Sequence, residues 1–467
     1  MEKTSYPVKK NAVYPLEITS LAFGGKGVAR INDYVIFVKQ ALPGDIVNAR
    51  IVKRKSSYAE AIIDSFSKKS DQRVDAPCEH FDYCGGCTWQ NLEYNNQLSH
   101  KTQIVKDAIR HISGLENCEI RPIIASSRPF HYRNKMEFSF ADRKWLTPDE
   151  LGDPDISKDF ALGLHVPGTF DKILHIEKCL LQTPECNEIL AFISRYAREN
   201  DIKPYGIKSH QGFLRFLVIR QSYFTKEIMV NIVTAYEDDN ILKPLALKLN
   251  EKFSQITSIV NNINTRKAQI AQGEKEILLS GKDCIVDKIG SFEFNISANS
   301  FFQTNTKQAE VLYDTAMDFA DLQTDDMVWD LYSGTGTISL YLAQKAKFVT
   351  GFEIAESSVQ NAFQNAEKYN LENVNFIAGD VIDNMQHLKE NVDVIVTDPP
   401  RSGMHEKVVD AIIKSKAQKV VYVSCNPTTM ARDLKLLSSN YTIDIIQPVD
   451  MFPHTYHIEC VTRLSHK

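Results

Sequence analysis

Three stretches of the sequence run as apolar, largely β-branched segments that stop abruptly at polar residues. They are VWDLYSGTGTISL at 328–340, DVIVTDPP at 393–400 and VVYVSCNP at 420–427. Such apolar runs are typical of strands buried on both faces of a parallel sheet. In open α/β sheets, ligands bind beyond the carboxyl ends of the strands. The sequence therefore predicts that a glycine loop, an acid and the thiol of Cys425 meet at one cleft.

The rest of the 467-residue chain predicts a multidomain α/β protein of three parts. Strand-like and helical segments alternate over 300–467, which predicts a Rossmann-like domain. Residues 68–299 are predicted to form an α+β middle domain, because 128–300 alternate strand-like runs with one helical run near 186–199. An amphipathic helix over 91–113 is expected to pack on the Rossmann-like domain. Residues 1–67 carry short alternating strands with glycine turns, which predict a small OB-like β-barrel.

Charge is distributed unevenly along the chain. The net charge is −5, yet residues 1–73 contain 13 Lys and Arg against 7 Asp and Glu. A basic module on an acidic body can bind the phosphates of RNA locally, although a solvated charged face is the alternative. The densest basic positions of this module are Lys26, Arg30, Lys53, Arg54 and Lys55.

The expected environment of the protein follows from its apolar segments and its cysteines. No run of 18 apolar residues occurs, and residues 1–18 lack the apolar core of a signal peptide. Nine cysteines in a large chain of this kind do not suggest disulfides. We therefore expect a cytoplasmic monomer that does not contact a membrane.

The glycine loop after the first apolar segment predicts a nucleotide-like cofactor. Gly334 and Gly336 let the backbone approach a ligand closely. The next strand ends at Glu353, 19 residues after Gly334, where an acid suits two ribose hydroxyls. The strand after it ends at Asp380, which could accept from an adenine amine. Each acid alone could be a solvated strand end. The loop resembles the D-x-x-x-G-x-G of class I S-adenosylmethionine methyltransferases.

Cys425 and Glu459 predict a particular methylation chemistry. Carbon 5 of a pyrimidine becomes nucleophilic enough to take a methyl group when a thiolate adds at carbon 6. A base must then remove the carbon 5 proton so that the thiol can leave. Cys425 is the candidate thiol and Glu459 the candidate base, with His454 and His457 as alternatives beside it. An inert buried thiol is the other interpretation of Cys425.

The order of the motifs resembles that of the RNA uracil-5-methyltransferase family. The segments are SFFQTN, DLYSGTGT, DPPRSG, VSCNPTTMARD and FPHTYHIE, and residues 11–66 resemble the RNA-binding TRAM domain. The resemblance implies an RNA (uracil-5-)-methyltransferase that uses S-adenosylmethionine, with Cys425 as nucleophile and Glu459 as proton acceptor. It implies cofactor contacts from Gln303, Tyr332, Thr337, Glu353, Asp380 and Asp398. Asp398 would face either the sulfonium or the uracil.

A separate group of cysteines predicts a metal centre. Its C-x5-C-x2-C pattern consists of Cys78, Cys84 and Cys87. Cys179 is the first candidate for a fourth ligand and Cys186 the second. The spacing alone is compatible with an iron–sulfur cluster or with zinc, and His80 is a further possible zinc ligand. Free thiols without a metal are the third alternative. The family resemblance implies a [4Fe–4S] cluster on Cys78, Cys84, Cys87 and Cys179.

The predicted substrate is a uridine in structured RNA, with 23S rRNA first and tRNA second. The barrel and the cysteine cluster favour rRNA, because the simpler tRNA enzymes of the family lack both. Two other functions compete with this one. An amino methyltransferase would not need Cys425, and its (D/N)PP(Y/F) motif has an aromatic residue where this chain has Arg401. A non-catalytic iron–sulfur RNA-binding protein would need neither Cys425 nor Glu459.

Overall fold

The computed structural model describes residues 6–387 and 391–467. These residues form two compact units, which we describe one at a time. The first unit is built from Met1–Asp75, Trp89–Ser127 and Val311–Lys467, and the second from Ala76–Thr88 and Arg128–Glu310. No helix in the described ranges is long and apolar enough to cross a membrane. The predicted boundaries after residues 67 and 299 stay predictions.

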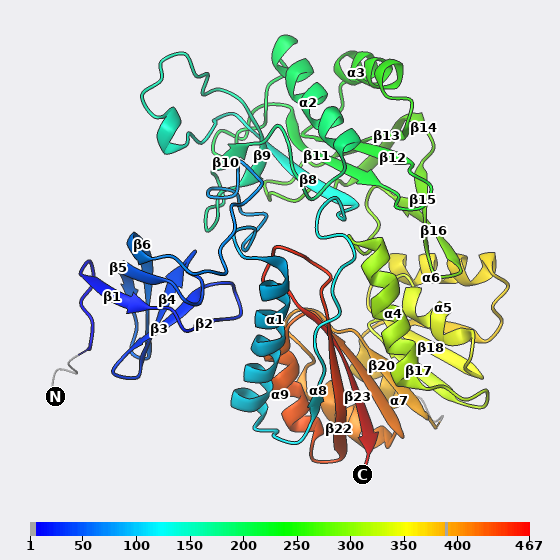
Figure 1. The fold of residues 1–467 in the computed structure, drawn as a ribbon. Helices are drawn as coiled ribbons and strands as arrows, with labels where there is room; N and C mark the ends of the chain where they lie inside the picture. The colour runs from blue at the N-terminus through cyan, green and yellow to red at the C-terminus, as the bar shows by residue number, and fades with distance from the viewer. Residues whose placement is uncertain (1–5, 388–390) are drawn as a thin grey trace. The chain divides into compact units, whose positions relative to one another are not determined.

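The amino-terminal part of the first unit is a six-stranded sheet with its own core (Figure 1). Its strands are β1 (Val13–Glu17), β2 (Ser20–Leu21), β3 (Gly27–Ile31), β4 (Tyr34–Lys39), β5 (Ile46–Arg54) and β6 (Tyr58–Lys68). They lie in the order β1-β5-β6-β4-β3-β2. Buried and more exposed residues alternate along β4, so that Ile36 and Val38 enter the core. This alternation is the period of two expected of a strand with one buried face.

The carboxyl-terminal part of the first unit is built on an eight-stranded sheet in the order β19-β18-β17-β20-β21-β23-β22-β7. Its strands are β7 (Glu119–Ile120), β17 (Met327–Leu331), β18 (Phe348–Glu353), β19 (Val374–Ala378), β20 (Val394–Thr397), β21 (Lys419–Ser424), β22 (Tyr441–Val449) and β23 (Glu459–His466). The five strands from β19 to β21 are parallel, and β23 runs antiparallel between β21 and β22. The strand order reverses at β17, which makes its carboxyl end the expected ligand crevice.

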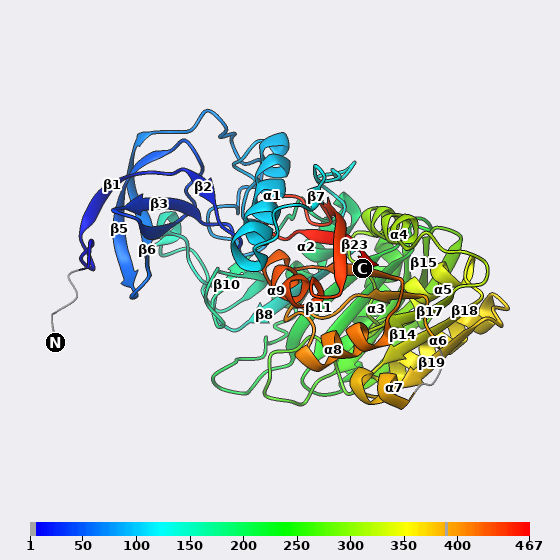
Figure 2. The same cartoon turned by 90° about the horizontal axis from the view of Figure 1, so that it is seen from below.

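Helices cover both faces of this sheet (Figure 2). The helices of this part are α1 (Tyr94–Ala108), α5 (Thr337–Ala343), α6 (Glu356–Lys368), α7 (Val381–His387), α8 (Glu406–Ser415) and α9 (Pro427–Leu437). Helix α1 continues into the π-helical turn η1 (Ile109–Ser113), which ends at Gly114. One hydrophobic core joins α1, α8 and α9 to the sheet, with Val105, Ile412 and Leu434 fully buried in it. Helices α5 and α6 contact β18 and β19.

The second unit is an α+β structure around a seven-stranded sheet in the order β10-β9-β8-β11-β12-β13-β14. Its strands are β8 (Lys135–Ala141), β9 (Ala161–His165), β10 (Ile173–His175), β11 (Leu214–Gln221), β12 (Ile228–Thr234), β13 (Ile256–Ile263) and β14 (Lys275–Gly281), and a hairpin of β15 (Cys284–Ile289) and β16 (Phe292–Ser297). The 3-10 turn η2 (Pro148–Glu150) interrupts the long β8–β9 connection. Helix α4 (Thr306–Ala320) leads from this unit into the first.

The sequence predicts one helix in this middle region, and the structure has two. Helix α2 (Pro184–Glu199) matches the predicted run near 186–199. Helix α3 (Asp239–Lys252) was missed, because Pro244 lies inside it and proline usually ends a helix. Its start is nevertheless well defined, since the Asp238 side chain accepts from the backbone N–H of Asn240.

Candidate active site

The glycine loop follows β17 and turns sharply at three residues with positive φ. These are Tyr332, Gly334 and Gly336, at φ 65°, 55° and 79°. A Cβ atom on Gly336 would lie 2.8 Å from the ring of Phe376, so this position requires glycine. A Cβ on Gly334 would meet nothing within 4 Å, which leaves open space beside the loop. The loop thus has one tightly packed glycine and one that borders room for a ligand.

Glu353, at the end of β18, fixes this loop directly. One carboxylate oxygen accepts from the backbone N–H of Gly334 at 3.0 Å, and the other accepts from the N–H of Ala355 at 2.8 Å. The predicted ribose acid is therefore also the acid that holds the glycine loop against the next strand. Hydrogen bonds from two backbone N–H groups fix the orientation of its carboxylate.

Tyr332 and Asp380 approach each other at the same edge of the sheet. Burial raises the pKa of Tyr332 to about 12, and the Asp380 carboxylate adds to the rise. Asp380 follows β19, is exposed, and accepts from the N–H of Ile382 at 2.8 Å. Thr337 opens α5, with its hydroxyl 3.4 Å from that of Thr335. Gln303 belongs to the second unit, so its role toward the cofactor stays a prediction.

A buried acid just before the loop is not among the predicted site residues. Asp330, the fourth residue of β17, has no exposed surface, and the Ser339 hydroxyl donates to one of its oxygens. Its other oxygen has no hydrogen-bond partner among the described residues. Burial raises the pKa of Asp330 to about 7, and the charges of Asp398 and Glu353 add to this rise. The only signal in the sequence is its place as the first acid of the D-x-x-x-G-x-G pattern.

Cys425 and Glu459 are brought together by the pairing of β21 with β23. Ser424 at the end of β21 is paired with Cys460, so Cys425 leaves the sheet opposite Glu459 at the start of β23. Burial raises the pKa of the Cys425 thiol to about 11, and the Glu459 carboxylate is the next contributor. Glu459 is 9% exposed, and this burial raises its pKa well above the ordinary value. Two groups far apart in the sequence thus interact electrostatically at one strand edge.

Asp398 and Arg401 complete this group of charges. The charge of Asp398 raises the pKa of both Cys425 and Glu459, and that of Arg401 opposes both shifts. Asp398 itself is partly accessible at the edge of β20, yet its protein surroundings desolvate it and raise its pKa to about 7. The site therefore holds a thiol and two carboxyl groups with raised proton affinity, balanced by one cation. A carboxylate with a raised pKa is a stronger base near neutral pH.

The segment after Asp398 is held by two residues of α9 that are not among the predicted site residues. Asp433 has no exposed surface and accepts from the N–H of Met404 and from the hydroxyl of Tyr422, both at 2.8 Å. Arg432 donates to the carbonyls of Ser402 and Met404 at 3.1 and 3.0 Å. These hydrogen bonds fix the backbone that carries Arg401. In the sequence, Arg432 and Asp433 stand out only as the last two residues of the segment VSCNPTTMARD.

The two histidines near Glu459 differ in their surroundings. His454 is buried, its Nδ1 lies 3.2 Å from the amide nitrogen of Gln97, and burial lowers its pKa to about 4. His457 is partly exposed, with its ring 4.3 Å from that of Tyr456. The low proton affinity of His454 makes it a poor base, so His457 is the better alternative to Glu459.

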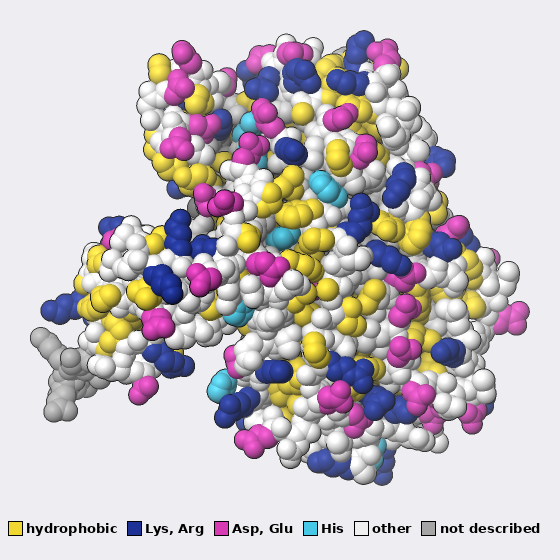
Figure 3. All heavy atoms as spheres, in the orientation of Figure 1, with side chains coloured by type: hydrophobic (Ala, Val, Ile, Leu, Met, Phe, Trp, Pro, Cys, Tyr) yellow, Lys and Arg dark blue, Asp and Glu magenta, His cyan; other side chains and the backbone are white. Residues whose placement is uncertain are grey.

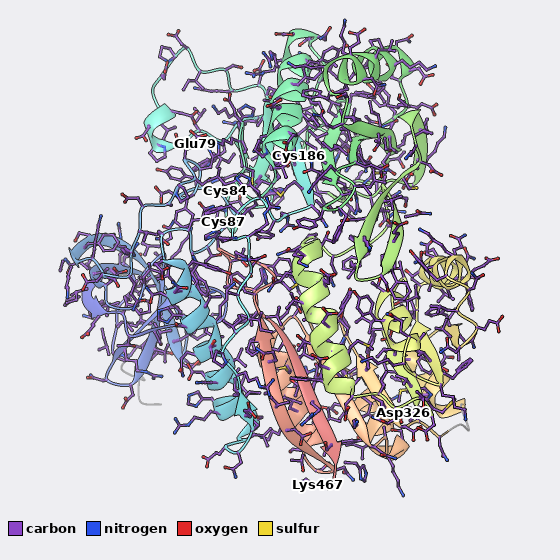
Figure 4. All side chains as sticks on the ribbon, turned by 45° about the vertical axis from the view of Figure 1, so that its right-hand side comes forward. Glu79, Cys84, Cys87, Cys186, Asp326 and Lys467 are labelled. Atoms are coloured by element: carbon purple, nitrogen blue, oxygen red, sulfur yellow. The ribbon has the colours of Figure 1, made fainter. Side chains whose placement is uncertain are left out.

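Three of the predicted cluster cysteines gather in the second unit. Burial raises the pKa of Cys84 to about 12, and the thiols of Cys179 and Cys78 contribute to that rise. Gly85 is needed in this loop, because a Cβ there would lie 2.6 Å from the carbonyl of His165. Figure 4 shows Cys84 and Cys87 close together on the same loop and Cys186 on α2. No group of three or more metal-ligating side chains within the described residues is arranged to hold a metal ion.

Some basic side chains of the barrel are paired with acidic neighbours. The face in Figure 3 carries Lys and Arg side chains intermixed with Asp and Glu. Lys26 and Lys53 both pair with Glu60, at 2.5 and 2.9 Å. The Arg54 guanidinium lies 4.2 Å from the ring centre of Tyr6. Two of the five densest basic positions, Lys26 and Lys53, are therefore already in ion pairs, while the net charge of the module is unchanged by this pairing.

Known proteins place the chain among RNA methyltransferases. Residues 207–467 match the family described as tRNA (Uracil-5-)-methyltransferase, and residues 7–63 match the TRAM domain. An uncharacterized RNA methyltransferase of Chlorobaculum tepidum is 40% identical over 99% of this chain and 98% of its own. Another from Bacteroides thetaiotaomicron is 41% identical over 95% of this chain and 100% of its own.

A solved relative extends the likeness to the whole structure. The crystal structure of Pyrococcus abyssi tRNA (uracil-54, C5)-methyltransferase in complex with S-adenosyl-L-homocysteine is 29% identical, with a TM-score of 0.74. The match covers 97% of this chain and 100% of that one. The chain is thus a class I S-adenosylmethionine-dependent RNA methyltransferase. It belongs to the tRNA (uracil-5-)-methyltransferase family, which confirms the predicted family, enzyme class, fold class and TRAM domain.

Proposed function

We propose that this protein methylates carbon 5 of a uridine in RNA through a covalent adduct between Cys425 and uracil carbon 6. The observation that supports this most strongly is the β21–β23 pairing, which sets Cys425 opposite Glu459. An amino methyltransferase has no use for a thiol at that strand edge. The raised proton affinity of Glu459 suits a group that must accept a proton from carbon.

Each residue of the site then has one task. The Cys425 thiolate forms a bond to carbon 6, and the electron pair of the 5,6 double bond moves toward carbon 5 and the 4-carbonyl oxygen. S-adenosylmethionine, when bound, supplies the methyl group that carbon 5 takes up. Glu459 next removes the proton from carbon 5, the 5,6 double bond forms again, and Cys425 leaves as thiolate. The positive charge of Arg401 lowers the pKa of both Cys425 and Glu459 and so stabilises their anionic forms.

The residues around the glycine loop fit the methyl donor. Open space beside Gly334 leaves room for it, and Glu353 presents a fixed carboxylate for ribose hydroxyls. We assign Tyr332 and Asp380 to the adenosine end, with Thr337 at the start of α5 and Gln303 as a further contact. The charge of Asp398 raises the pKa of Asp330, which precedes the glycine loop, and also the pKa of the Cys425 thiol. That supports a position at the sulfonium or at the uracil.

We predict 23S rRNA as the substrate, with tRNA as the second candidate. Domain architecture does not separate the two, because the Pyrococcus abyssi enzyme named for tRNA matches 97% of this chain. The target uridine must in either case leave its stack for carbon 6 to reach Cys425.

Mapping 5-methyluridine in a deletion strain tests the proposed reaction. Loss of one or two 5-methyluridines from 23S rRNA, restored by the wild-type gene and not by Cys425→Ala, is the expected result. Loss from tRNA with the same rescue pattern would keep the chemistry and change the substrate. Rescue by Cys425→Ala, or loss of a methylated exocyclic amine instead, would refute the adduct mechanism.

We also propose that Cys78, Cys84, Cys87 and Cys179 hold a [4Fe–4S] cluster that staples the second unit. The mutual electrostatic effects of the Cys78, Cys84 and Cys179 thiols support it. Zinc is the alternative occupant, because thiolates bind zinc as readily as an iron–sulfur cluster. A cluster spreads its four thiolates over different irons. The backbone of Cys179 is already held by Asn187, through hydrogen bonds of 2.8 and 3.1 Å.

Metal analysis of anaerobically purified protein tests this assignment. About four irons per chain and their loss in Cys84→Ser are expected, while Cys186→Ser should keep the iron. Cys186 is the matched control, because it is equally buried and contacts Gln221 instead of the other thiols. One zinc per chain without iron would refute the cluster.

A further inference from the structure

A hollow in the second unit combines an aromatic side chain with an excess of basic ones. Its volume is about 1140 Å³, large enough for a nucleotide, and its walls come from the β8–β9 connection and from residues 171–172 and 207–208. Five lining side chains are basic and three are acidic. Trp145 is the aromatic member. None of these residues belongs to the candidate active site or to the cysteine cluster.

The charges in this hollow are only partly neutralised by the protein. Lys208 pairs with Asp171 at 2.9 Å, and Lys144 pairs with Glu150 at 2.6 Å. The other three cations, Arg143, Lys158 and Lys172, are not in an ion pair with any described residue. Together with the two remaining lining acids, Asp142 and Asp159, they leave one net positive charge, 3 − 2. Arg143, Lys158 and Lys172 are all exposed. Available positive charge beside an aromatic ring is the usual composition of a site for single-stranded nucleic acid.

Trp145 is held in place from two sides. Its backbone N–H donates at 3.1 Å to the carbonyl of Ile173, the first residue of β10. Its ring contacts that of Tyr83, with centroids 5.5 Å apart and planes at 53°. The indole nevertheless remains partly exposed and lines the hollow. A ring fixed in this way loses little conformational entropy when a base stacks on it.

The apolar rim of the hollow supports the same occupant. Leu151, which also lines it, is 66% exposed and adds apolar surface to the rim. The loop that carries it is ordered by a capping box, in which Thr147 and Glu150 exchange hydrogen bonds. An exposed apolar side chain on an ordered loop beside cations fits a flat base attached to a phosphate.

We propose that this hollow binds one single-stranded nucleotide of the RNA substrate, other than the target uridine. Its base stacks on Trp145 and its phosphate lies among the three available cations. The proposal rests on the proposed function for the identity of the ligand, because that function makes RNA the substrate. The hollow contains neither Cys425 nor Glu459, so it contributes binding and not chemistry.

Tryptophan fluorescence offers a direct test on the full-length protein. The chain has three tryptophans, and Trp89 and Trp329 are only 1% and 5% exposed. A single-stranded oligoribonucleotide of mixed sequence should therefore quench mainly Trp145. Trp145→Phe should bind the same RNA within a few-fold of wild type and lose the quench. Trp145→Ala should weaken binding about 5- to 150-fold, the range for one lost base–aromatic stack.

A charge-matched pair of variants tests the phosphate part of the site. The triple change Arg143→Gln, Lys158→Gln and Lys172→Gln should lower the log–log salt slope of binding by up to about 2, or about 0.7 for each phosphate that the protein no longer binds. The control triple, Arg195→Gln, Lys252→Gln and Lys267→Gln, removes three exposed charges that are in no ion pair with a described residue, from the same unit outside the hollow. The control should leave the slope unchanged.

The outcomes separate this proposal from the proposed function. An RNA-induced quench that persists in Trp145→Phe, or unchanged affinity of a folded Trp145→Ala, would overturn the proposal. Uridine monophosphate that binds as tightly as the oligonucleotide would also overturn it and indicate a free-nucleotide site. Wild-type protein that quenches with RNA and forms no 5-methyluridine would refute the proposed function alone. Thermal unfolding of each variant confirms that it is folded.

Discussion

Replacing Asp433 by asparagine removes a buried charge without changing the shape of the side chain. Asp433 has no exposed surface and accepts from the Met404 N–H, the Tyr422 hydroxyl and the Arg432 guanidinium. Asparagine offers one acceptor oxygen where the carboxylate offers two. Its amide nitrogen would therefore face a donor, and the least costly choice turns it toward Arg432, whose side chain is 48% exposed.

The expected loss follows from that geometry. Breaking a fully buried ion pair costs about 3–5 kcal/mol, and the exposure of the Arg432 side chain reduces this to about 2 kcal/mol. The loosened hydrogen bonds from Arg432 to the carbonyls of Ser402 and Met404 should also displace Arg401. If the displacement of Arg401 raises the activation free energy of methylation by about 1.4 kcal/mol, kcat/KM falls about tenfold.

Urea unfolding of the full-length protein and RNA methylation kinetics measure the two effects of Asp433→Asn. Asp410→Asn is the matched control, because Asp410 is an exposed acid on the neighbouring helix α8. The control should stay within about 0.5 kcal/mol of wild type. If Asp433→Asn matches the control in both assays, Asp433 does not hold the segment that carries Arg401.

Three other perturbations follow from the site and the barrel. Gly336→Ala should abolish S-adenosylmethionine binding in calorimetry, because its Cβ would lie 2.8 Å from Phe376 at φ 79°, and binding within a few-fold of wild type would contradict this. Alkylation of Cys425, followed by mass spectrometry, should accelerate as pH rises toward its pKa of about 11. Glu459→Gln should make it faster at pH 9 by removing a charge that raises that pKa; a slower reaction would refute the coupling. Neutralising the five basic barrel residues should lower the salt slope of RNA binding by about 0.7 for each phosphate that is released, and an unchanged slope would exclude the barrel from RNA binding.

The sequence was most informative where short segments carry both structure and chemistry. Apolar runs that end in Gly334, Asp398 and Cys425 predicted a parallel sheet with its polar groups at one edge, and the class I fold is confirmed. These predictions succeed because a short apolar run that ends at polar or turn residues is typical of a buried strand. The order of the motifs was sufficient to predict the family.

Other features depend on tertiary interactions that no local pattern encodes. The pairing of Ser424 with Cys460 is set by an antiparallel strand inserted between β21 and β22, and register between distant strands cannot be read from either one. Asp433 looks like any polar residue on a helix until Met404 and Tyr422 are seen to donate to it. Helix α3 was not predicted because Pro244 lowers the helix propensity of this segment. In the folded protein, the packing of its buried leucines outweighs that low propensity.

The covalent adduct is the most direct test of the proposed mechanism. Glu459→Gln keeps the size of the side chain and removes the base, which should slow turnover about 10²- to 10⁴-fold. Incubated with S-adenosylmethionine and substrate RNA, this variant should accumulate a protein–RNA species that survives denaturing electrophoresis. The double variant Cys425→Ala, Glu459→Gln should form none. Wild-type turnover by Glu459→Gln without an adduct, or an adduct that persists without Cys425, would contradict the account.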